Sequence, residues 1–165
     1  MQESILLYFQ ELGNPVLDFI FELITMLGEK NILIGVIAWI YWNMDKKKGF
    51  ILSYTLLFSL VVNTVLKISF HRQRPFEVIP EIAGKRVQTA TGYSFPSGHT
   101  QGATTFYLTL ALLFKKWWIY AAAVIISLLV AVSRLYLGVH WPVDVIASLI
   151  VGSVLSILLY QILNK

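Results

Sequence analysis

The three longest apolar stretches of this chain contain no charged side chain, and they constrain its fold more than any other feature: residues 49–66, 117–133 and 145–164. A helix needs about 20 mainly apolar residues to cross the hydrocarbon core of a bilayer, so each stretch predicts a transmembrane helix. The composition agrees, because 57% of the residues are hydrophobic and 13% are charged, against about 45–50% and about 25% in soluble domains. The sequence therefore argues against a soluble globular protein.

Two shorter apolar stretches predict further spans. Residues 100–114 are followed by two lysines, and this helix can be extended backwards to Gly98. Residues 31–44 end in aromatic side chains of the kind found at membrane interfaces, and this helix is expected to begin near Gly28.

The first 27 residues predict two short helices. Residues 1–12 carry two glutamates and no basic start, which is typical of an interfacial helix rather than a signal peptide. Pro15 occupies the favoured first position of the next helix. Asp18 and Glu22 are four residues apart on one helical face, which we expect to meet the membrane interface. Whether residues 15–27 cross the membrane completely is left open by their length.

The predicted fold class is therefore all-α: a polytopic membrane bundle of about five or six transmembrane helices with an N-terminal interfacial helix. The length allows one domain, residues 1–165, and no large additional domain. The absence of cysteine excludes disulfides, thiolate metal sites and a cysteine nucleophile.

The net charge of +4 comes from 13 Lys and Arg against nine Asp and Glu. If the spans alternate in direction, six basic residues fall on one side: Lys46, Lys47, Lys48, Lys115, Lys116 and Lys165. The other side receives seven basic residues, so the total count does not decide the orientation, but short loops are better evidence than the long connection. By the positive-inside rule the side with the six lysines is then expected to be cytoplasmic, which predicts a multi-pass protein of the cytoplasmic membrane. The long polar connection of residues 74–97 then lies on the extracytoplasmic face. With the basic residues assigned in this way, nucleic acid is not an expected partner.

Polar residues gather in three segments at the ends of predicted spans, and alternation places all three on the extracytoplasmic side. They are Lys67–Pro75, Pro96–His99 and Ser133–Asp144. Lys67, Arg74 and Arg134 are three cations, and a guanidinium group matches a phosphoryl group bidentately. The sequence thus predicts an anion site at the extracytoplasmic ends of the helices.

The second segment supplies backbone donors for the same anion. Ser97 stands where a helix N-cap belongs, and the free N–H groups that follow it at Gly98 and His99 favour an anion. Gly98 would also let the anion approach the backbone closely. Pro75 disfavours the α region at Arg74, so we expect the preceding helix to end there and the Arg74 side chain to turn into the loop.

Two histidines complete the set. His140 precedes Asp144 by four residues, with Pro142 suited to begin a helix, so the carboxylate can fix one ring nitrogen and leave the other free to attack. His99 can then protonate a leaving oxygen. Asp144 is the only carboxylate in the three segments, and three converging cations oppose a metal ion, so no metal and no cofactor are expected.

The pattern Lys67-x6-Arg74-Pro75, Pro96-Ser97-Gly98-His99 and Ser133-Arg134-x5-His140-x3-Asp144 resembles the three-part signature of the type 2 phosphatidic acid phosphatase superfamily, over roughly residues 49–163. The resemblance implies that His140 is the nucleophile of a phosphohistidine intermediate, oriented by Asp144, and that His99 is the general acid. It also implies phosphate binding by a further set of residues: Lys67, Arg74, Ser97, Gly98 and Arg134. No metal is implied.

The resemblance predicts a membrane-embedded phosphatase that removes a phosphomonoester or a terminal phosphate from a lipid. A substrate of the phosphatidylglycerophosphate or phosphatidate type is our first expectation, and undecaprenyl diphosphate is the alternative. A non-enzymatic lipid-phosphate binder or carrier stays a more remote alternative, and transfer to an acceptor other than water stays open. The oligomeric state is not indicated by the sequence.

Several polar or aromatic residues near the signature receive weaker interpretations. His71 and Arg72 are expected to be interface or loop charges. Tyr93 and Phe95 either line the entry for a lipid chain or pack against the protein. Four charged residues of the long loop are expected to be solvated: Glu77, Glu81, Lys85 and Arg86.

Overall fold

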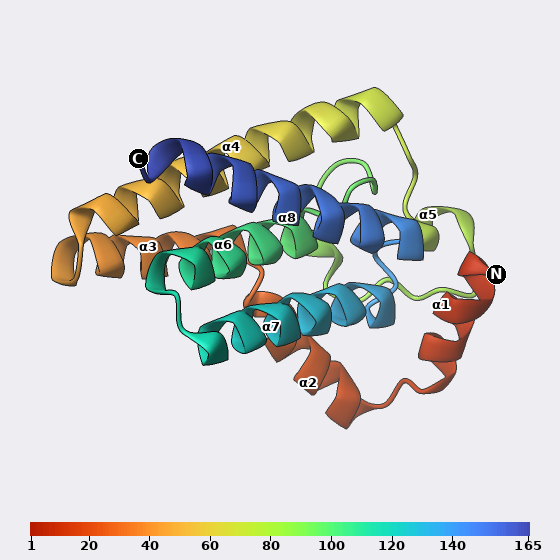
Figure 1. Cartoon of the computed structure of the whole chain (residues 1–165). Coiled ribbons are helices and arrows are strands. Elements are labelled where there is room, and N and C mark those ends of the chain that lie inside the picture. The colour runs from red at the N-terminus through yellow and green to blue at the C-terminus, as the bar shows by residue number, and fades with distance from the viewer.

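The structure, a computed structural model, describes all 165 residues, and its regular elements are all helical (Figure 1). The α-helices are α1 (Gln2–Glu11), α2 (Pro15–Met26), α3 (Lys30–Asn43), α4 (Lys46–Phe70), α5 (Pro75–Val78), α6 (Gly98–Phe114), α7 (Trp117–Tyr136) and α8 (Pro142–Leu163). A 3₁₀ turn, Val87–Thr89, lies in the long loop between α5 and α6. The all-α prediction is confirmed.

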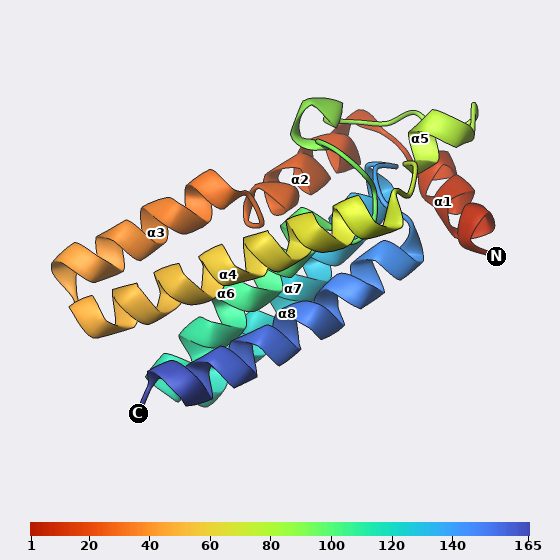
Figure 2. The ribbon, with the colours of Figure 1, turned by 90° about the horizontal axis from the view of Figure 1, so that it is seen from above.

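The long helices run side by side, with α6 in the middle (Figures 1 and 2). Helix α6 packs against α4, α7 and α8, while α3 packs on α4, and α2 packs on α7. The N-terminus, α1, α5 and the start of α8 lie at one end of the bundle, and the C-terminus lies at the other (Figure 1). The three signature segments lie toward the end that carries the N-terminus.

The central position of α6 follows from its small and polar residues. Adding a Cβ to Gly152 of α8 would bring it within 3.0 Å of the Thr104 Cβ, so glycine lets these two helices approach closely. Several buried polar groups are paired between helices: the Ser59 and Thr105 hydroxyls are 2.9 Å apart, and Gln101 Nε2 donates to the Ser59 carbonyl at 2.8 Å. Because these polar groups find partners, α6 can be buried with a low apolar content.

An apolar core holds α3 against α4 and α6. It consists of the buried side chains Leu33, Ile37, Ile40, Leu52, Leu56 and Phe106. Removing such side chains from contact with water or lipid headgroups and packing them densely fixes the position of α3. The start of α3 is thereby held beside the start of α6.

Helices α4, α7 and α8 are long and apolar enough to cross a membrane, as predicted from the three uncharged stretches. Helices α2 and α3 together pass the same test as a broken span with a bend of 46°. Helix α6 has 17 residues. Three spans, or four with the bent pair, are thus supported, and the count of five or six stays a prediction, as does the interfacial position of α1.

Two local expectations about helix ends have different outcomes. Asn14 caps α2, and its side chain accepts from the Val16 and Leu17 N–H groups at 3.1 and 3.0 Å, so the predicted start at Pro15 is confirmed. Helix α4 ends at Phe70 rather than at Arg74, because His71 adopts a left-handed conformation with φ of 45°. The predicted end was wrong by four residues, since the backbone had already left the helix before Pro75 could restrict it.

The expectation that the charges of the long loop are solvated was wrong for Lys85 and Arg86, whereas Glu81 is exposed. Lys85 Nζ lies 2.5 Å from Asp18 Oδ1, which also accepts from the Tyr136 hydroxyl at 2.6 Å. Arg86 NH2 lies 2.6 Å from Glu29 Oε1. Acidic residues of α2 and of the turn that follows it therefore hold the loop onto the bundle, and the position of the Asp18–Glu22 face at the membrane interface stays a prediction.

Candidate active site

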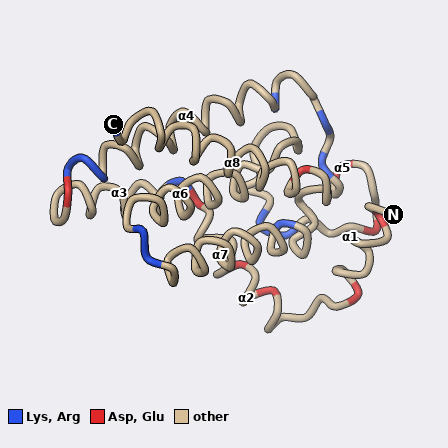
Figure 3. Tube along the Cα trace, in the orientation of Figure 1, with Lys and Arg blue, Asp and Glu red and all other residues tan.

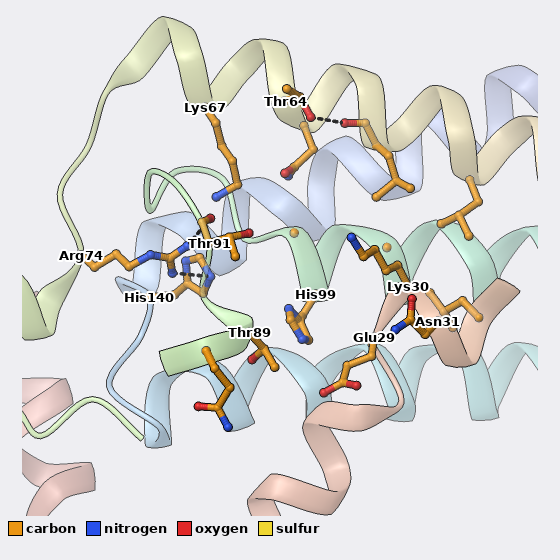
Figure 4. A pocket seen from close by; sticks show the side chains of 18 residues that line it. Glu29, Lys30, Asn31, Thr64, Lys67, Arg74, Thr89, Thr91, His99 and His140 are labelled. Atoms are coloured by element: carbon orange, nitrogen blue, oxygen red, sulfur yellow. Dashed lines mark hydrogen bonds between the residues drawn. The ribbon is translucent and has the colours of Figure 1, made fainter. Parts of the chain in front are cut away.

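The three signature segments meet around one cavity of about 430 Å³ (Figure 4). Five of the eight predicted site residues line it: Lys67, Arg74, Gly98, His99 and His140. They come from the end of α4, the loop before α5, the start of α6 and the turn between α7 and α8. Of the 18 lining residues only three are hydrophobic, so the cavity is polar. Alternating spans predicted that the three segments lie together at one end of the helices, and this is confirmed for these five residues.

The buried pair of His140 and Asp144 has the predicted geometry. His140 Nδ1 lies 3.5 Å from Asp144 Oδ2, and the two side chains are 2% and 0% exposed. The turn before α8 produces this arrangement, since Asp144 also accepts from the Trp141 N–H at 2.9 Å and so caps its own helix. The carboxylate is therefore fixed beside one ring nitrogen of the histidine.

Ser94 also contacts this pair, although no pattern in the sequence marked it as a site residue. Its hydroxyl donates to Asp144 Oδ2 at 2.5 Å and lies 3.4 Å from His140 Nδ1. The side chain is completely buried. Ser94 stands in an irregular loop 50 residues before Asp144, where no helical periodicity marks it. Its position three residues before Ser97 is the one sequence signal that could have drawn attention to it.

Arg74 holds the opposite nitrogen of His140. Its NH1 group lies 3.3 Å from His140 Nε2 and donates to the Val139 carbonyl at 2.9 Å. Other guanidinium nitrogens donate to the Gly92 and Thr91 carbonyls at 3.0 and 2.9 Å. These loop carbonyls fix the Arg74 side chain. Figure 4 shows its guanidinium group directed at His140. The prediction that Arg74 turns into the loop is confirmed.

The electrostatic surroundings keep His140 neutral. Complete burial, together with the cations Arg134, Arg74 and Lys67, lowers the pKa of His140 well below its ordinary value. A neutral imidazole has a lone pair on one nitrogen. Because Nδ1 faces Ser94 and Asp144, that lone pair is expected on Nε2, the nitrogen beside Arg74.

Lys67 and His99 face the cavity from α4 and α6 (Figure 4). Lys67 Nζ donates to the Tyr93 carbonyl, which ties the end of α4 to the loop. His99 Nε2 is buried and has no hydrogen-bond partner in the chain. A buried nitrogen without a partner is costly, so this nitrogen is available to a bound molecule.

Ser97 and Gly98 begin α6 as predicted. The Ser97 hydroxyl accepts from the Thr100 N–H at 3.4 Å, but Ser97 does not line the cavity. A Cβ added to Gly98 would meet only Asn63 Oδ1, at 3.5 Å. The chain itself therefore leaves room for a side chain at Gly98, and the glycine keeps the start of the helix open toward the cavity.

Arg134 is fully buried and does not line the cavity. Its NH1 group donates to Thr25 of α2 at 2.8 Å, while Nε and NH2 have no partner. A buried cation with two unpartnered nitrogens is unfavourable unless an anion completes it. The contact with Thr25 joins residues 109 positions apart, and no local pattern in the sequence indicates it.

Arg72 also contacts the site, contrary to its interpretation as a loop charge. Its NH1 group lies 3.6 Å from Asp144 Oδ1, and its guanidinium carbon lies 5.1 Å from the centre of the Trp141 ring. Glu77, expected to be solvated, accepts from the Arg74 N–H at 2.7 Å. Both charges therefore help to hold the loop that carries the site.

The aromatic residues before the second segment pack against the end of α4. The Phe95 and Phe70 rings are 4.7 Å apart, and the Tyr93 and His71 rings are 4.6 Å apart. Neither Tyr93 nor Phe95 lines the cavity. No group of three His, Cys, Asp or Glu side chains in the chain is arranged to hold a metal ion.

Comparisons with known proteins agree on one family. The family model described as PAP2 superfamily matches residues 48–165. An undecaprenyl-diphosphatase of Sulfolobus acidocaldarius is 35% identical over 141 residues, which are 84% of this chain and 67% of that protein. Undecaprenyl-diphosphatase BcrC of Bacillus subtilis is 32% identical, over 90% of this chain and 76% of that protein.

A solved structure has the same arrangement of helices. The crystal structure of a transmembrane PAP2-type phosphatidylglycerolphosphate phosphatase from Bacillus subtilis superposes with a TM-score of 0.82 at 27% identity. The alignment covers 99% of this chain and 85% of that chain.

Proposed function

The chain belongs to the PAP2 superfamily, a family of phosphatases, and we propose that it is a membrane-embedded lipid phosphatase acting through a phosphohistidine on His140. The observation that carries the proposal is the orientation of that imidazole. Nδ1 faces Asp144 and Ser94, while Nε2 faces Arg74 at the cavity. A neutral imidazole held in this way has the lone pair of a nucleophile directed at a bound phosphoryl group.

In the first step, His140 Nε2 attacks the phosphorus of the substrate. The N–P bond forms as the bond between phosphorus and the leaving oxygen breaks, and His99 gives its proton to that oxygen. The dianionic phosphate beside His99 favours the protonated form of this imidazole, so substrate binding itself prepares the acid. The products of the step are the dephosphorylated lipid and phosphohistidine.

In the second step, water hydrolyses the phosphohistidine. His99, now neutral, takes a proton from the attacking water, and the N–P bond breaks to return neutral His140 and inorganic phosphate. Asp144, held by Ser94 and the Trp141 N–H, stabilises the positive charge on the imidazole while it carries the phosphoryl group.

The charge on the transferring group is stabilised by cations of the chain. Lys67 and Arg74 stand at the cavity, and Arg134 lies behind it with two unpartnered nitrogens. Together with the N–H groups at the start of α6 they serve the role that magnesium ions have in other phosphoryl transfer enzymes. We therefore propose that the reaction needs no metal ion.

A lipid substrate is supported by an apolar groove on α4. Leu57, Phe58, Val61 and Val65 line it, and Leu60 and Thr64 line both the groove and the polar cavity. The groove has a volume of about 530 Å³ and is open on one side. An acyl or prenyl chain can lie there while its phosphate reaches His140, so that headgroup and chain occupy neighbouring polar and apolar surfaces.

The identity of the lipid is a choice between two classes. Our first expectation, a phosphatidylglycerophosphate or phosphatidate type, accords with the name of the similar crystal structure. The alternative, undecaprenyl diphosphate, accords with the names of the two sequence relatives. A non-enzymatic binder is disfavoured because His99, His140 and Asp144 are all present and arranged around the cavity.

We further propose that the protein lies in the cytoplasmic membrane with the cavity on the extracytoplasmic side. The chain has no cysteine, so single cysteines can be placed at Lys47 and Thr89 and treated with an impermeant thiol reagent in intact cells. Labelling at position 89 and protection at position 47 are expected. The reverse pattern would place the site in the cytoplasm.

The function is tested by phosphate release from lipid phosphates in detergent with a chelator present. The wild-type protein is expected to be active, and His140→Ala is expected to lose roughly 10³-fold or more because it lacks the nucleophile. The phosphorylated protein is treated separately with acid and with base. Phosphohistidine survives the base treatment but not the acid treatment, whereas phosphoserine survives acid, so the two are distinguished. Full activity of His140→Ala, or strict dependence on an added metal, would contradict the mechanism.

A further inference from the structure

The polar cavity continues past the residues assigned to phosphate transfer. Lys67, Arg74 and His140 lie at one end, and Lys30 and Asn31 line the other (Figure 4). His99 lies between the two ends in this view. A single phosphoryl group contacts only one end of a cavity of about 430 Å³, so the other end is available to a further part of the substrate.

The break between α2 and α3 brings Lys30 to this position. Gly28 lies so close to α6 that a Cβ there would stand 2.8 Å from the His99 carbonyl oxygen. The Tyr107 hydroxyl donates to the Leu27 carbonyl at 3.1 Å and fixes the same break against α6. Lys30 is therefore held beside His99 by backbone packing, not by a flexible loop.

The charge of Lys30 is not compensated within the chain. Lys30 is exposed to the cavity and forms no ion pair or side-chain hydrogen bond. The neighbouring carboxylate, Glu29, instead accepts from Arg86 Nε and NH2 at 3.2 and 2.6 Å. Glu29 also leaves the first N–H groups of α3 without a side-chain cap, so they add partial positive charge at the same place.

We infer that Lys30 and the start of α3 bind a second phosphate group, and that the substrate is a lipid diphosphate rather than a lipid monophosphate. The inference rests on the proposed function. The terminal phosphate occupies the end with Lys67 and Arg74, and the phosphate bonded to the lipid occupies the end with Lys30.

The position of His99 between the two ends agrees with this order. When His140 Nε2 bonds to the terminal phosphorus, the bridging P–O bond breaks, and the bridging oxygen takes its proton from His99. The leaving group is a lipid monophosphate, whose charge Lys30 stabilises in the transition state. A monophosphate substrate has no group at that place and gains nothing from Lys30.

The test compares two substrates that differ by one phosphate, farnesyl diphosphate and farnesyl monophosphate. Lys30→Met is expected to lower kcat/KM for the diphosphate roughly tenfold or more, the loss of one charge-assisted contact, and to change that for the monophosphate by less than about twofold. Lys30→Arg is expected to retain most of the diphosphate activity. Lys46→Met, an exposed lysine at the opposite end, is the matched control.

The outcomes separate this inference from the proposed function. Equal losses on both substrates, no loss on either, or a wild-type preference for the monophosphate would overturn the diphosphate assignment and leave a lipid phosphatase. Absence of hydrolysis of either substrate by the wild-type protein would overturn both. Because Lys30 is exposed, Lys30→Met is expected to purify and melt like the wild type.

Discussion

Both ends of the helical bundle carry basic residues, but the two sets stand in different surroundings (Figure 3). At the end with the C-terminus, Lys46, Lys47, Lys115 and Lys116 are exposed. At the other end, Arg74 is 2% exposed and Arg134 is fully buried. The same side-chain charge is therefore solvated at one end and enclosed by protein at the other.

Hydration explains why the two sets of basic residues act differently. An exposed lysine keeps its hydration and contributes to orientation by its sign alone, so its exact place matters little. A buried guanidinium must replace its hydration with fixed partners, which Arg74 finds in loop carbonyls and Arg134 finds only in part. An incomplete set of partners costs stability and leaves donors for a substrate.

The strongest test of the comparison is Arg134→Met. Activity is expected to fall about 100-fold or more, because a charge that stabilises the phosphoryl group is lost. The melting temperature is expected to stay the same or rise, since methionine removes a buried cation with two unpartnered nitrogens. Lys116→Met serves as the matched variant at the exposed end. A large fall in melting temperature would show that Arg134 is structural and break the comparison.

Ser94→Ala is expected to have the next largest effect. Without the hydroxyl, the Asp144 carboxylate loses its contact at 2.5 Å, so His140 is less well oriented and kcat falls roughly tenfold or more with little change in KM. Ser94 is a positioning residue, so its effect passes through Asp144.

A double-mutant cycle examines that dependence. Ser94→Ala is expected to lower kcat much less in the Asp144→Asn variant than it does in the wild type. Threonine at position 94 keeps the hydroxyl and is expected to restore part of the activity. Additive losses in the cycle would mean that Ser94 acts by another route.

The third prediction concerns stability and pH. Because the pKa of His140 is lower in the folded protein than in the unfolded chain, acid favours unfolding. The stabilising contribution is complete above the unfolded value of about 6.5 and decreases by up to about 1.4 kcal/mol for each pH unit below it, until the folded pKa is reached.

Thermal melts of the wild type and of His140→Gln at pH 7.5 and 5.5 measure this contribution. The wild type is expected to lose more stability between the two values than the variant does. Identical pH dependence would mean that His140 is not the buried neutral group that distinguishes this end of the bundle.

The smallest effect is expected for the exposed lysines. Lys47→Gln and Lys115→Gln should each change kcat/KM by less than about twofold, because substitutions of exposed residues away from a site are usually nearly neutral. Activity assays on the two single variants check this. A loss comparable to that of Ser94→Ala would show that the exposed end takes part in the reaction.

Much of the fold was predictable because its signals are local. Uncharged runs predicted α4, α7 and α8, Pro15 predicted the start of α2, and Ser97 predicted the start of α6. Helix starts depend on neighbouring residues, through capping and proline geometry. The end of α4 escaped prediction, since His71 leaves the helix in a left-handed conformation that no preceding or following residue demands.

The pairing of His140, the proposed nucleophile, with Asp144 was also predictable from the sequence, because the two residues lie one helical turn apart and local geometry brings them together. The surroundings of this pair depend instead on contacts between segments that are far apart in the sequence. Ser94, Thr25 and Lys30 reach the site from loops and helices distant in the chain. Their positions follow from the close approach of helices at glycines and from polar pairs between them, and such contacts leave no periodic trace in a single sequence.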